Sequence, residues 1–82
     1  MDDYSVELQH MGSRIRAIRK HIGLKLLDLE TSTGIYDSEI SRIERGLVKV
    51  EVQTVYRIAK ALGVEIRDVF DYNGPLPAHK SK

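Results

Sequence analysis

The chain has 82 residues, of which 41% are hydrophobic and 30% are charged, and its formal net charge is +1. This length suits one small domain near the lower limit for independent folding, and it leaves no room for an enzyme with a deep active-site pocket. The composition is that of a folded protein, because a disordered chain would have fewer apolar residues and a larger net charge.

The chain contains no cysteine. This removes disulfides, thiolate metal sites and a cysteine nucleophile, and it fits a reducing compartment. No apolar run approaches the ~18 residues of a membrane span, and the first residues, MDDYSVE, lack the regions of a signal peptide. We therefore expect a cytoplasmic protein without membrane association.

The first predicted helix lies in the part of the chain where apolar residues recur every three or four positions. These residues are Leu8, Met11, Ile15, Ile18 and Ile22. Gly12 interrupts the pattern at a cost of about 1 kcal/mol relative to alanine. We therefore expect the stable part of this helix to begin near Ser13, as an N-cap, and to end at Gly23.

Two short helices are predicted next. The second begins near Leu26, carries acidic residues in its first turns and ends at Gly34. The third, within YDSEISRIERG, begins near Tyr36 or Asp37 and ends at Gly46. Because only a tight turn separates them, these two helices must cross at a large angle.

The segment LVKVEV alternates apolar and polar residues, but a strand without a partner is unstable, so we predict a loop. Residues 52–62 predict a fourth helix, and VEIRDVF predicts a short fifth helix that points Ile66, Val69 and Phe70 inward. The end of the chain, NGPLPAHKSK, is rich in glycine, proline and polar residues, which is typical of a flexible tail.

These segments resemble the phage-repressor and Cro type of helix-turn-helix protein, the Xre family. IRAIRKHIGL resembles the first helix of that family, LDLETSTGI the second helix and turn, SEISRIERG the recognition helix, and VYRIAKALGVEIRDVF the last two helices. The resemblance implies an all-α fold, a compact five-helix lambda-repressor-like domain in residues 13–71. An N-terminal arm or helix extension in residues 1–12 and a flexible C-terminal tail in residues 72–82 complete the expected organisation.

The resemblance also implies a sequence-specific DNA-binding transcriptional regulator, with a homodimer on a two-fold-related operator of double-stranded DNA. Its recognition helix, about residues 36–45, would enter the major groove. The residues expected at base edges are Tyr36, Asp37, Ser38 and Arg42, and those expected at phosphates are Lys25, Arg45 and Lys49. Arg42 is the leading candidate for direct readout, because a guanidinium can donate two hydrogen bonds to guanine.

The resemblance further implies a structural ion pair between Arg19 and Glu44, which would join the first helix to the end of the third. Three positions depart from the family pattern. Lys25 and Leu26 replace the usual capping residue and glutamine of the second helix, so this helix should begin less firmly. Glu30 replaces an alanine, and tight helix crossing then requires its carboxylate to reach solvent.

Asp37 and Glu39 place negative charge at the head of a helix that is expected to touch a polyanion. Asp37 can cap the helix or accept a hydrogen bond from a cytosine amino group. Glu39 precedes the core residue Ile40, and a rotation of about 100° per residue carries it to the flank of the helix, away from the groove floor. The alternative is that both acids weaken DNA binding.

A second function therefore stays open: a protein-interaction module of the same fold, such as an antitoxin component, with a protein partner and weak DNA binding. Apolar residues that look exposed favour this reading, namely Leu47, Val48 and Val50. Dimerisation rests on the small size of the domain and on an apolar patch expected around the fifth helix. This patch comprises Val69, Phe70, Tyr72 and Leu76.

Nothing in the sequence predicts catalysis, a metal site or a cofactor. The three histidines, His10, His21 and His79, are scattered without the spacing of metal ligands. Ser38 and Ser41 have no partnered histidine that would make either of them a nucleophile.

Overall fold

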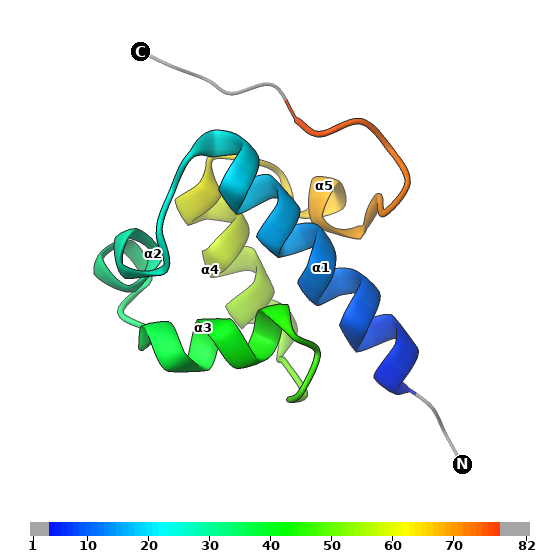
Figure 1. The fold of residues 1–82 in the computed structure, drawn as a ribbon, viewed down its shortest axis with the longest axis horizontal. Coiled ribbons are helices and arrows are strands. Elements are labelled where there is room, and N and C mark those ends of the chain that lie inside the picture. Colours follow the sequence, from blue (N-terminus) through cyan, green and yellow to red (C-terminus); the bar gives the residue numbers. More distant parts are fainter. Residues whose placement is uncertain (1–3, 78–82) are drawn as a thin grey trace.

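The computed structural model describes residues 4–77 of the protein, which form five helices (Figure 1). The helices are α1 (Tyr4–Ile22), α2 (Leu26–Thr33), α3 (Asp37–Glu44), α4 (Val52–Leu62) and α5 (Ile66–Phe70). The all-α, five-helix fold expected from the sequence is confirmed. His79 and the rest of residues 78–82 lie outside the described part of the chain.

A single hydrophobic core joins the five helices. α1 crosses the domain and contacts α3, α4 and α5, while α2 contacts α3 and α4 (Figure 1). The largest fully buried side chains are Ile15, Ile18, Leu29, Ile40, Ile43, Ile58 and Val69. Side chains spaced three or four positions apart lie on one face of a helix, and the apolar faces predicted from the sequence pack together in this core. No helix within residues 4–77 has the length and apolar character needed to cross a membrane.

The long first helix differs from its prediction. α1 runs without a break from Tyr4, so Ser13 lies inside the helix and the prediction of an N-cap there is wrong. Gly12 is buried against α3, where an added Cβ would lie 2.5 Å from the carbonyl oxygen of Glu44. Because helices in proteins draw most of their stability from packing, this close approach offsets the low helix propensity of glycine.

The turn between α2 and α3 follows the prediction. Gly34 ends α2 with φ of 79°, a left-handed conformation that disfavours side chains with a Cβ, and its N–H donates to the Glu30 carbonyl at 2.8 Å. α3 begins three residues later, at Asp37, and packs against α2. This short connection is what places α3 at the edge of the domain (Figure 1).

The segment between α3 and α4 has no regular secondary structure, as predicted for LVKVEV. Of the three apolar residues that looked exposed, Leu47 is exposed, while Val48 and Val50 are partly buried against the core. The exposed apolar surface in this loop is therefore smaller than the sequence indicated.

The short fifth helix points only part of its predicted apolar set inward. Val69 is fully buried and Ile66 packs against the core, but Phe70 is 46% exposed. A helix of five residues has one buried face, and Phe70 follows Val69 by a rotation of about 100°. Because Val69 is in the core, its predicted place in an exposed dimer patch is wrong.

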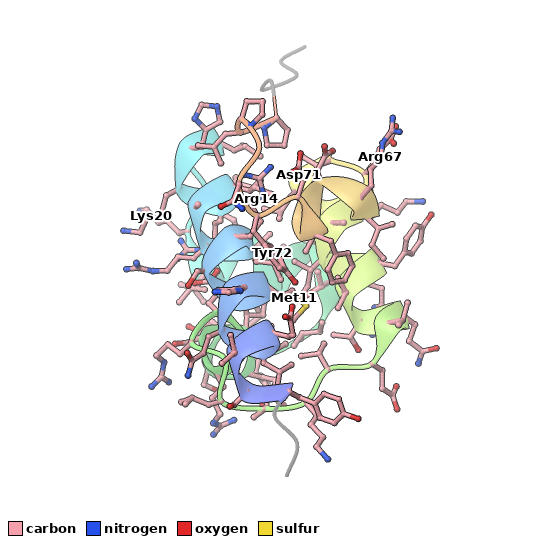
Figure 2. The ribbon with its side chains drawn as sticks, turned by 90° about the vertical axis from the view of Figure 1, so that its right-hand side faces the viewer. Met11, Arg14, Lys20, Arg67, Asp71 and Tyr72 are labelled. Carbon is pink, nitrogen blue, oxygen red and sulfur yellow. The ribbon has the colours of Figure 1, made fainter. Side chains whose placement is uncertain are left out.

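The first part of the predicted tail is fastened to the domain. Arg14 is buried and donates to three backbone carbonyls: Asp68 at 2.8 Å, Gly74 at 3.1 Å and Pro75 at 3.0 Å. Figure 2 shows Arg14 between α1 and the segment that follows α5. Nothing in the sequence indicated this attachment, because backbone carbonyls leave no side-chain pattern. The domain boundaries at residues 12 and 71 stay predictions.

Candidate nucleic-acid interface

α3 has one face in the core and one in solvent. Ile40 and Ile43 are buried, whereas Ser38, Arg42 and Arg45 are exposed. The three exposed residues are spaced by four and three positions, so they share one side of the helix. These three of the side chains predicted at DNA therefore lie on an accessible surface at the edge of the domain.

The N-terminal end of α3 is capped from another helix. Tyr36, which is 75% exposed, occupies the N-cap position but makes no capping hydrogen bond with its side chain. The N–H of Asp37 instead donates to Oε1 of Glu30 on α2, at 2.8 Å. Asp37 is the first residue of the helix, so its predicted capping role is wrong, and its predicted contact with cytosine stays a prediction.

This cross-helix cap also explains how an acid fits at residue 30. The Glu30 carboxylate is partly buried and meets a backbone donor of α3, so it ties the two helices together without needing to reach open solvent. The sequence did not reveal the contact, because a glutamate seven residues ahead of its partner matches no local capping pattern.

The start of α2 is held by its third residue. A lysine side chain has no hydrogen-bond acceptor, but the N–H of Lys25 donates to the Asp28 carboxylate at 2.7 Å. This contact is the reciprocal half of a capping box, and it offsets the weak start expected from Lys25. The Lys25 side chain is exposed, and its contact with a phosphate stays a prediction.

The buried end of α3 is joined to α1 by the two residues that the resemblance had paired. Nε of Arg19 lies 2.7 Å from Oε2 of Glu44, and NH2 lies 3.0 Å from Oε1. The remaining terminal nitrogen of Arg19 donates to the Leu24 carbonyl at 2.9 Å. Both residues are buried, and no buried side-chain polar atom within residues 4–77 lacks a partner. This pair fixes α3 against α1 and the α1–α2 connection.

The exposed side of α3 carries a second ion pair. NH1 of Arg42 donates to Oε1 of Glu39 at 2.8 Å, and the two side chains are 50% and 42% exposed. Glu39 thus pairs with a residue that is expected at base edges, and its position away from the groove floor stays a prediction. The spacing of three positions was the sequence signal for this contact.

Two basic residues of α1 lie near this surface and were not among the predicted DNA contacts. Arg16 lines a shallow hollow with Lys20, Lys25 and Asp37, and a neighbouring hollow with Arg45. Arg16 and Lys20 are exposed, and Figure 2 shows Lys20 projecting away from α1. Their spacing of four was the available signal, because it places both on one side of the helix.

The five basic residues between positions 14 and 25, apart from His21, therefore fall into two groups in the structure. Arg14 and Arg19 are buried and structural, whereas Arg16, Lys20 and Lys25 are exposed near the starts of α2 and α3. Lys49 lies apart from these residues, in a hollow formed with the beginning of α1.

The comparisons with known proteins agree with this geometry. The family model that matches is described as helix-turn-helix, and it covers residues 15–69. A search among curated protein sequences found no match.

Three solved structures have the same fold. The restriction-modification controller protein C.AhdI from Aeromonas hydrophila is 31% identical with a TM-score of 0.76, over 79% of this chain and 98% of that one. The clp gene regulator ClgR from C. glutamicum is 25% identical with a TM-score of 0.75, over 78% and 83%. The DNA-binding domain of BldD is 28% identical with a TM-score of 0.73, over 84% and 97%.

The names of these neighbours denote regulators or a DNA-binding domain, and not enzymes. The family match spans more than half of the chain, and it includes the turn at Gly34 and the whole of α3. The chain belongs to the Xre-like helix-turn-helix family and has the fold of its DNA-binding transcriptional regulators.

Proposed function

We propose that the protein is a sequence-specific transcriptional regulator that inserts α3 into the major groove and binds a two-fold-related operator as a homodimer. The observation that carries this proposal is the two-sided character of α3. Ile40 and Ile43 anchor it in the core, while Ser38, Arg42 and Arg45 face solvent. A helix held in this way can present its polar side to base edges. The cytoplasmic location expected from the cysteine-free sequence belongs to the same proposal.

Phosphate contacts supply most of the affinity in this scheme. Lys25, Arg45 and Lys49 carry the predicted contacts, and the exposed Arg16 and Lys20 extend the basic surface beside Lys25 and Arg45. Each phosphate that a lysine or arginine side chain neutralises releases counterions, so the affinity for DNA falls steeply as the salt concentration rises.

A homodimer is proposed because one small domain contacts few base pairs. Phe70 and Leu76 are 46% and 38% exposed and provide apolar surface next to the C-terminal segment. Analytical sedimentation at roughly tens of micromolar protein tests this part of the proposal. A monomer at that concentration would rule out the proposed homodimer.

The second candidate is a protein-interaction module with weak DNA binding. Leu47 and Tyr36 favour it, because they are 60% and 75% exposed at the two ends of α3. Glu39 favours it as well, since its charge offsets that of Arg42.

Selection of bound duplexes from a random pool, followed by fluorescence anisotropy, separates the two functions. A regulator enriches one two-fold-related sequence, and Arg42→Ala lowers affinity for that sequence by about 5- to 150-fold, the range for one bidentate base contact. The matched control is Arg67→Ala, because Arg67 is an exposed arginine on α5, which does not contact α3 (Figure 2). Failure of the wild-type protein to enrich any sequence would overturn the proposal.

A further inference from the structure

The exposed ion pair of α3 places a carboxylate beside the arginine proposed to read bases. NH1 of Arg42 and Oε1 of Glu39 are 2.8 Å apart, one helical turn from each other. Both side chains are about half exposed, so the pair stands at the surface that the proposed function turns toward DNA. A negative charge at this position opposes the attraction of α3 to phosphates.

Fold stability accounts for only a small part of the role of this carboxylate, which as an acid in the first turn of α3 interacts favourably with the helix dipole. Ion pairs between solvent-exposed side chains contribute little to stability, because water screens them and two long side chains must be ordered. α3 is already anchored by Ile40 and Ile43, and by the buried pair that Glu44 makes with Arg19. A further role for Glu39 comes from its contact with Arg42.

The contact orients the guanidinium and leaves its reading edge free. A guanidinium has five N–H donors, and guanine accepts two of them at O6 and N7. Glu39 engages NH1, and the Arg42 side chain makes no other hydrogen bond or ion pair within residues 4–77, so the Nε and NH2 donors stay available together. A side chain that is ordered before binding loses less conformational entropy on binding.

The same contact would also disfavour binding to other sequences. Without a suitable base, Arg42 can only turn to a phosphate, and the charge of Glu39 disfavours that contact. A site can gain specificity by weakening its binding to competing sequences, as well as by strengthening its binding to the target sequence.

We propose that Glu39 is a specificity-determining residue that acts by positioning Arg42. It holds the guanidinium for guanine and suppresses its use on phosphates. This inference rests on the proposed function, and it assigns a role to a residue that makes no base contact of its own.

The test compares the wild-type protein with Glu39→Ala, Glu39→Gln and Arg42→Ala on the selected operator. The guanine read by Arg42 is the one whose replacement by adenine weakens the wild-type protein by about 5- to 150-fold but leaves Arg42→Ala unaffected. At that base, Glu39→Ala lowers the discrimination by about 2- to 10-fold, the lower part of the range for two side chains in contact. Glu39→Gln lowers it less, because the amide oxygen still accepts from NH1.

A second readout is binding to an unrelated duplex. Both Glu39 variants bind it more tightly than the wild type, and the slope of log affinity against log salt steepens by about 1 for Glu39→Ala, the effect of one added phosphate contact. The matched control is Glu65→Gln, which removes an exposed carboxylate paired with Arg67 at 2.9 Å, at the start of α5. It should leave the discrimination at this guanine unchanged.

The double variant Glu39→Ala with Arg42→Ala shows whether Glu39 works through Arg42. The expected result is the discrimination of Arg42→Ala alone. The inference is overturned if Glu39→Ala keeps the wild-type discrimination, or if it lowers discrimination equally in the Arg42→Ala background. Either result leaves the proposed function intact, which fails separately if the wild-type protein selects no sequence.

Discussion

α3 makes two arginine–glutamate pairs of nearly equal length in opposite surroundings. Arg19 and Glu44 meet at 2.7 Å with side chains 9% and 3% exposed, whereas Arg42 and Glu39 meet at 2.8 Å with side chains 50% and 42% exposed. The buried pair joins α1, α3 and the α1–α2 connection. Neither of its charges can return to water unless the structure opens. In the exposed pair, Glu39 occupies only NH1 of Arg42, so within the described part of the chain the other donors of this guanidinium remain free for a ligand. Burial, and not the chemistry of the two groups, therefore decides which pair holds the fold and which is available for binding.

Breaking the buried pair should have the largest effect. Glu44→Ala leaves the Arg19 guanidinium buried without its carboxylate, and we expect the free energy of unfolding to fall by about 3–5 kcal/mol. Urea unfolding followed by circular dichroism measures this loss.

The matched change is Glu39→Ala, which should lower the free energy of unfolding by at most about 1 kcal/mol. Equal losses in the two variants would show that burial does not distinguish the pairs.

The next largest loss in the free energy of unfolding is expected from a change at the contact between α1 and α3. In Gly12→Ala the new Cβ meets the carbonyl groups of Ile43 and Glu44, which are backbone atoms and cannot rotate away. We expect a loss of about 1–3 kcal/mol in the same unfolding measurement, the usual cost of overpacking.

The neighbouring exposed residue provides the control for this change. Ser13→Ala should stay within about 0.5 kcal/mol of the wild type. A Gly12→Ala protein as stable as the wild type would mean that α1 and α3 can separate without penalty, and that the buried pair alone holds them.

Glu30 is intermediate between the two pairs, because its partly buried carboxylate pairs with a backbone N–H and not with a cation. Glu30→Ala should lower the free energy of unfolding by about 0.5–2 kcal/mol, the range for loss of a helix N-cap. Glu30→Gln keeps an acceptor for the Asp37 N–H and should lose less. If both variants lose equally, the cap is not what stabilises the start of α3.

The smallest effect is expected at Tyr72, on the side of α1 away from α3 (Figure 2). Burial, and then the nearby Glu7 carboxylate, raises the pKa of the Tyr72 phenol above its usual value of 10.0. The folded protein therefore holds this proton more tightly than the unfolded chain does. The resulting stabilisation is complete below about pH 10 and is lost as the pH rises further.

Urea unfolding of the wild type and Tyr72→Phe, between about pH 8 and 11, measures this contribution. The free energy of unfolding of the wild type should decline more steeply above pH 10 than that of the variant, which has no phenol to titrate. Parallel curves would show that Tyr72 titrates alike in both states.

The five helices could be predicted because their signals are local. Apolar spacing of three and four marked each buried face, and Gly23, Gly34 and Gly63 marked three helix ends. The beginning of α1 was misread, because Gly12 was judged by its helix propensity alone. Its real role depends on α3, which lies about 30 residues further along the chain.

The candidate site was predictable to the same extent. The exposed side of α3 follows from the period of the helix, and Arg16 and Lys20 could have been found from their spacing. The partners of the charged groups were harder to predict from the sequence. Glu30 meets a backbone donor of another helix, and Arg14 meets three carbonyls beyond α4.

The sequence by itself determined where the chain is helical, which side of each helix is apolar and which family the chain resembles, because these depend on residues within a few positions of one another. The tertiary structure alone decided which of the many arginines and glutamates are buried and which groups they pair with. Burial is a property of the assembled helices, and it changes the energetic consequence of a charge by several kcal/mol, on the order of the stability of a small domain.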